Sequence, residues 1–63
     1  MSYADDLEKA INKKLKAIRN GTLPVKGCGV NDLISKLKTV DEAGAERLQK
    51  DYIAAINIVT KKK

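Results

Sequence analysis

The chain has 63 residues, a formal net charge of +5, one cysteine and no histidine. This length allows one domain, and the residue types exclude an internal disulfide and a zinc site, so we expect no metal. No apolar run approaches the roughly 20 residues of a bilayer-spanning helix, so we also expect no membrane span. The N-terminal segment is acidic and polar, unlike a secretory leader, and with the lone cysteine it predicts a cytoplasmic protein.

The first predicted helix covers about residues 2–20. Ser2 lies three residues before Asp5, which is the spacing of an N-cap with an acidic partner, and Gly21 is a typical C-terminal stop. Apolar residues recur at the three- and four-residue steps of an amphipathic helix: Ala4, Leu7, Ala10 or Ile11, Leu15 and Ile18.

The next segment, residues 21–30, holds three of the four glycines and the only proline. Pro24 favours an extended backbone at Leu23, and the apolar Leu23 and Val25 indicate a loop that lies against the core. Cys28 is interpreted as a small, partly buried apolar residue of this loop. The alternative is a thiol made reactive by Lys26 and by the start of the following helix.

Two further helices are predicted over about residues 31–38 and 40–60. Asn31 is a favoured N-cap for the first, and Thr39 with Glu42 has capping-box spacing for the second. Residues 52–59 are apolar nearly all round and rich in β-branched types, so a strand is the alternative there; the helical period that leads into them favours a helix. The sequence therefore predicts an all-α three-helix bundle, with residues 1–63 as one domain and residues 61–63 as a basic tail.

Basic residues without interleaved acids mark the helix over residues 2–20. Lys9, Lys13 and Lys16 follow one another at i, i+4 and i+7, on the side away from Leu7 and Ile11. Such a stripe can neutralise phosphates of a nucleic acid or contact an acidic protein surface. The alternative is ordinary solvated helix surface, because lysine is a good helix former.

The loop offers a second candidate contact. Val25-Lys26-Gly27-Cys28-Gly29 resembles the apolar-x-Gly-apolar-Gly hairpin of the helix-hairpin-helix family of DNA-backbone binders. The resemblance implies binding without sequence specificity through the backbone of residues 27–31. Glycines let that backbone approach a phosphate closely, and N–H groups at a helix start attract anions; a tight turn packed on the core is the alternative. The predicted nucleic-acid-binding residues are Lys9, Lys13, Lys16, Arg19, Lys26, Gly27, Gly29 and Asn31.

No enzymatic activity and no cofactor are predicted, because the chain has no histidine to activate its thiol or its serines. We expect a protein that binds the phosphate backbone without strong sequence specificity. The alternative is a protein–protein interaction module, a small regulator or inhibitor, with a homodimer and a monomer both open because so short a chain buries little surface. The predicted interface is the apolar face of the third helix: Tyr52, Ile53, Ile56 and Val59.

Overall fold

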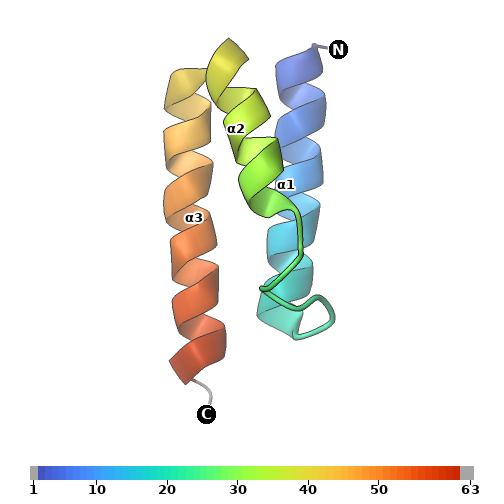
Figure 1. Cartoon of the computed structure of the whole chain (residues 1–63), viewed down its shortest axis with the longest axis vertical. Helices are drawn as coiled ribbons and strands as arrows, with labels where there is room; N and C mark the ends of the chain where they lie inside the picture. Colours follow the sequence, from blue (N-terminus) through green and yellow to red (C-terminus); the bar gives the residue numbers. More distant parts are fainter. Residues whose placement is uncertain (1, 62–63) are drawn as a thin grey trace.

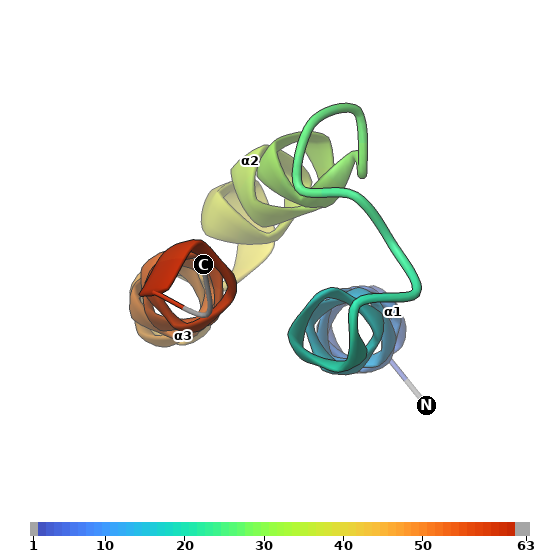
Figure 2. The ribbon, with the colours of Figure 1, turned by 90° about the horizontal axis from the view of Figure 1, so that it is seen from below.

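The computed structural model describes residues 2–61, which form three helices and no strand in that range. Helix α1 covers Tyr3–Asn20, α2 covers Val30–Val40 and α3 covers Glu42–Lys61 (Figure 1). The helices surround one central core along a rod of 37 × 17 × 16 Å (Figure 2). The predicted all-α three-helix bundle is confirmed, and residues 52–59 are helical. Of the predicted basic tail, Lys61 ends α3, and Lys62 and Lys63 lie outside the described residues.

Both ends of α1 agree with the sequence prediction. The Ser2 side chain caps the helix, since its Oγ accepts a hydrogen bond of 3.2 Å from the Asp5 N–H. At the other end the Gly21 N–H donates to the carbonyls of Ala17 and Ile18, which satisfies acceptors that the helix leaves open. The residues that α1 buries are Leu7, Ile11, Leu15 and Ile18.

The start of α2 differs from the prediction. Asn31 is not the N-cap: Gly29 holds that position with a left-handed backbone (φ +80°), and its carbonyl accepts from the Leu33 N–H at 3.2 Å. The physical reason is burial, because Cys28 and Val30 on either side of Gly29 both enter the core. A glycine is the residue that takes this backbone conformation without strain. Asn31 lies exposed in the first turn of α2.

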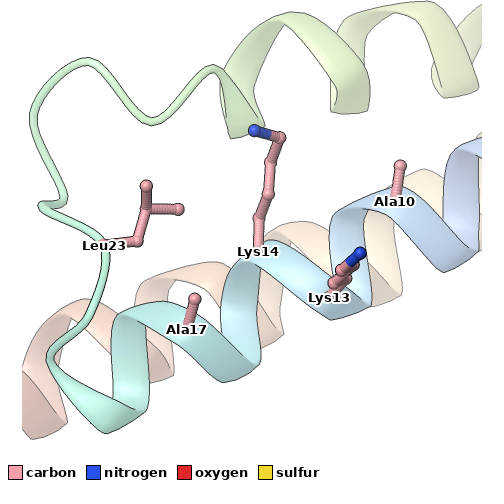
Figure 3. A pocket seen from close by; sticks show the side chains of 5 residues that line it. All are labelled: Ala10, Lys13, Lys14, Ala17 and Leu23. Atoms are coloured by element: carbon pink, nitrogen blue, oxygen red, sulfur yellow. The ribbon is translucent and has the colours of Figure 1, made fainter.

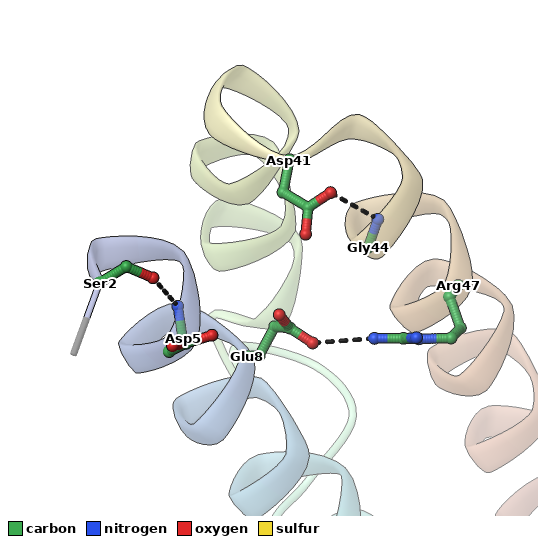
Figure 4. A network of polar contacts seen from close by, with 6 residues as sticks. All are labelled: Ser2, Asp5, Glu8, Asp41, Gly44 and Arg47. Atoms are coloured by element: carbon green, nitrogen blue, oxygen red, sulfur yellow. Dashed lines mark hydrogen bonds and ion pairs between the residues drawn. The ribbon is translucent and has the colours of Figure 1, made fainter.

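The junction between α2 and α3 also differs. The predicted capping box of Thr39 and Glu42 is wrong, because α2 continues to Val40 and Thr39 lies within it, its Oγ1 donating to the Lys36 carbonyl at 2.6 Å. The cap is Asp41, whose Oδ1 accepts from the Gly44 N–H at 3.1 Å (Figure 4). A single residue therefore separates two antiparallel helices.

The core joins all three helices and the loop. An exposed ion pair of 2.9 Å between Arg47 and Glu8 adds a link between α3 and α1, which at such a surface site contributes up to about 1 kcal/mol (Figure 4). Burial of apolar side chains is therefore the main stabilising term. The buried residues are Leu7, Ile11, Leu15, Ile18, Cys28, Val30, Ile34, Leu37, Ala45, Leu48, Tyr52 and Ala55.

Candidate nucleic-acid interface

Three lysines form the outer side of α1. Lys9, Lys13 and Lys16 are all exposed, and we call them the lysine face. At 3.6 residues per turn they lie within roughly 60° of one another around the helix and about 180° from the buried side, which Ile11 marks. The packing of α1 against the core therefore points the lysine face into solvent, as the sequence spacing predicts.

No carboxylate neutralises these lysines in the described residues. The ion pair found within residues 2–61 is the one between Arg47 and Glu8. The chain from Lys9 to Asn31 contains six basic residues and no acidic one. No lysine of this face is therefore held in an ion pair within residues 2–61.

Several acidic residues lie at the end of the rod where α1 begins. The start of α1, with Asp5 and Glu8, and the α2–α3 junction, with Asp41, lie at the same end of the bundle (Figure 1). The second half of α1 and the loop that follows it form the other end. The part of α1 and of the loop from Lys13 to Asn31 carries five basic residues and no acidic one, so an anion is attracted to the loop end.

The other predicted basic residues lie at this loop end. Arg19 is exposed in the last turn of α1, three residues after Lys16, so it continues the basic surface toward the end of the helix. Lys26 is exposed in the loop between α1 and α2. Both residues belong to the loop end, since Arg19 lies in the last turn of α1 and Lys26 in the loop that follows it.

The glycine turn before α2 has an open outer side. Gly27 and Gly29 are exposed and left-handed (φ +81° and +80°), and a Cβ at either position would meet no atom within 4 Å. No side chain caps α2, so the N–H groups of its first turn have no partner from a capping residue. The predicted contact over residues 27–31 is sterically accessible.

Cys28 points away from this open side and into the core. Its Sγ lies 3.6 Å from the Tyr52 hydroxyl, and both side chains are buried. The hydrogen bond with Cys28, followed by burial, raises the pKa of Tyr52. Cys28 is thus a packing residue, and Tyr52, which the sequence also places at a protein interface, contributes its side chain to the core.

The other residues of the predicted protein interface differ in how much of each side chain is exposed to solvent. Ile56 and Val59 are half-buried and pack against the core, and Ile53 is 51% exposed. Ile58, which the sequence reading missed, is 43% exposed. Because five residues correspond to about 140° around a helix, Ile53 and Ile58 lie on different flanks of α3 and do not form one patch.

A groove beside the lysine face was not predicted. Ala10 and Ala17 form its floor, Leu23 from the loop forms one wall, and Lys13 and Lys14 complete the lining around about 350 Å³ (Figure 3). We call it the Leu23 groove. It depends on the path of the loop, which the Leu23 N–H fastens to the Ala17 carbonyl at 3.3 Å. The one signal in the sequence is the pair of alanines seven residues apart, which places both on one flank of α1.

Residues 2–61 contain no group of three or more cysteine, aspartate or glutamate side chains that is placed to hold a metal ion. Within the same range, no helix has both the length and the apolar composition that a bilayer crossing requires. Comparison with protein-family models, with curated proteins and with solved structures found no match.

Proposed function

We propose that this protein binds the phosphate backbone of nucleic acids through the lysine face, without enzymatic activity and without strong sequence specificity. One observation carries the proposal: Lys9, Lys13 and Lys16 are exposed together, opposite the buried side of α1, with no acid paired to them in the described residues. Lysines that neutralise phosphates release condensed counterions, which supplies most of the free energy of non-specific binding.

The loop end extends the proposed contact. Arg19 and Lys26 add charge there, and the glycine turn has no Cβ that would keep a phosphate from its backbone. The resemblance to the helix-hairpin-helix family supports the same use of this turn. The contacts of the lysine face itself are to phosphates, since Tyr52 is buried and Tyr3 is the first residue of α1, which leaves no aromatic residue beside the lysine face for base stacking.

The test is the affinity for duplex DNA and RNA as a function of salt concentration. Each neutralised phosphate contributes a slope of about −0.9 to log K against log salt, so three lysines predict about −2.7, and Arg19 with Lys26 bring the slope to about −4.5. Absence of detectable binding at about 50 mM salt, where such contacts are strong, would contradict the proposal.

The second candidate function is a protein-interaction module. The observation that favours it is the exposure of Ile53, at 51%, with the half-buried Ile56 three residues further along α3. A pull-down from lysate with and without nuclease separates the two functions. Partners that disappear after nuclease treatment support nucleic-acid binding, whereas one protein retained in both samples supports the interaction module; sedimentation of the pure protein tests the homodimer.

A further inference from the structure

The Leu23 groove has the lining of a site for a small anionic ligand with an apolar part. Its floor is the methyl groups of Ala10 and Ala17, and its wall is the half-buried Leu23. Lys13 and Lys14 supply positive charge, and no acidic residue lines the groove. We propose that it holds one unpaired nucleotide of a single strand that is bound along the lysine face, an inference that rests on the proposed function.

The size of the groove fits one nucleotide and not a larger element. Its volume of about 350 Å³ lies at the lower end of the range of ligand sites in proteins, which begins at about 300 Å³. A helix of a partner protein is about 10 Å in diameter and needs a longer trough. The groove is short, because its floor consists of two alanines two helical turns apart.

The two lysines decide the chemistry of the occupant. In Figure 3 the Lys14 side chain rises from α1 between Leu23 and Ala10, and Lys13 projects from α1 between Lys14 and Ala10. A phosphate between these ammonium groups is attracted by both charges, and the attached sugar or base covers the alanine methyls and Leu23. An uncharged apolar ligand would make no favourable electrostatic interaction with Lys13 and Lys14.

The groove also continues a surface already assigned to nucleic acid. Lys13 belongs both to the lysine face and to the lining of the groove. A strand whose phosphates follow Lys9, Lys13 and Lys16 therefore passes the mouth of the groove. The next nucleotide reaches it by turning its base away from the strand.

Base pairing decides which nucleic acids can use the groove. In a duplex the bases are paired and stacked, so phosphates and sugars alone reach the lysine face, whereas a single strand can turn a base outward. Phosphate contacts alone favour the duplex, because its charges are more closely spaced. Binding of a nucleotide in the groove thus raises the affinity for the single strand, which phosphate contacts alone bind less tightly than the duplex.

The experiment fills the groove and compares two probes. Affinities for labelled oligothymidine and for a DNA duplex of equal length are measured for the wild type, Ala17→Leu and the control Ala54→Leu, which adds the same side chain at an exposed position of α3. We expect Ala17→Leu to weaken oligothymidine binding about five- to tenfold, because the added side chain excludes the nucleotide from its apolar contact with the groove, and to change duplex binding less than about twofold. Ala54→Leu changes neither affinity.

The result that overturns the inference is separate from failure of the proposed function. Ala10→Leu fills the other end of the groove and is the second test, with circular dichroism to verify the fold of each variant. If filling leaves oligothymidine affinity unchanged, or weakens both probes equally, the groove holds no nucleotide although the lysine face binds. If the wild type binds neither probe at low salt, the proposed function itself fails, and the inference with it.

Discussion

At the scale of single residues, the buried contact between Tyr52 and Cys28 makes stability depend on pH in the alkaline range. The hydrogen bond with Cys28 and then burial raise the pKa of Tyr52 above its usual value of 10.0. A raised pKa in the folded state means that the stabilisation is complete below pH 10 and is lost as the pH rises through the folded-state value. We therefore expect the free energy of unfolding to fall above pH 10.

Lysines lose their charge over the same pH range, so Tyr52→Phe is the control that isolates the tyrosine. Unfolding by denaturant is measured for both proteins at neutral pH and above pH 10. The wild type is expected to lose more stability than Tyr52→Phe. In a Tyr3→Phe background, the absorbance of tyrosinate reports Tyr52 alone, because the chain has two tyrosines. Equal losses of stability in the wild type and in Tyr52→Phe, with a Tyr52 titration that is not shifted upward, would contradict the predicted role of Tyr52.

The spacing of apolar residues in the sequence predicts which side chains are buried, as Tyr52 shows. The helical period of α3 places Tyr52 in its apolar stripe, and the structure buries it there. The partner of its hydroxyl was not predictable, since Cys28 is 24 residues away and reaches Tyr52 through the fold of the loop. The exposed flanks of α3 were not predictable either, because residues 52–59 are apolar on nearly every side and their sequence does not say which flank the core covers.

At the scale of elements, the Asp41 cap at the start of α3 depends on the absence of a side chain at Gly44. Helix propensity predicts that Gly44→Ala stabilises α3 by up to about 1 kcal/mol. In the structure, however, a Cβ at Gly44 would lie 2.5 Å from Oδ2 of Asp41, whose other oxygen accepts from the Gly44 N–H. The alanine would displace the cap, which is worth about 1 kcal/mol. We therefore expect no gain in stability from Gly44→Ala in the wild type.

The same substitution has a different outcome once the cap is removed. Asp41→Ala alone is expected to lower the free energy of unfolding by about 1 kcal/mol. In that background Gly44→Ala raises stability by several tenths of a kcal/mol, up to about 1 kcal/mol, because the clash is gone. A double-mutant cycle from chemical denaturation measures the difference. Additive effects of the two substitutions would show that they do not interact.

Helix ends were predictable where a single capping residue was available. Ser2 stands alone before its helix, and its prediction as the cap is confirmed. Around Asn31 and Thr39 several residues can cap at the right spacing. The choice there depends on tertiary burial: Val30 enters the core and moves the start of α2 to Gly29, and the continuation of α2 to Val40 leaves Asp41 as the cap.

At the scale of the whole molecule, the bundle turns a charge pattern in the sequence into a basic face on α1. The three-helix fold was predictable, because apolar periodicity marks the buried side of each helix. The lysine face followed from the same periodicity, since the outer side of α1 is defined by the side that it buries. The Leu23 groove was not predictable, because it requires the path of the loop after Gly21. Charge placed on one helix, and not net charge, is the central feature of the proposed function.

Two charge-matched variants test this claim most directly. One replaces Lys9, Lys13 and Lys16 with glutamine; the other replaces Lys36, Lys38 and Lys50, which are exposed on α2 and α3. Each removes three positive charges from the total of +5, and glutamine keeps the helix propensity of lysine. Duplex affinity is measured against salt for both, and circular dichroism confirms that each is folded.

We predict that loss of the lysine face makes the slope of log K against log salt shallower by about 2.7, while the control variant stays within about 1 of the wild type. Equal changes in the two variants would show that net charge alone governs binding, which contradicts a defined lysine face on α1.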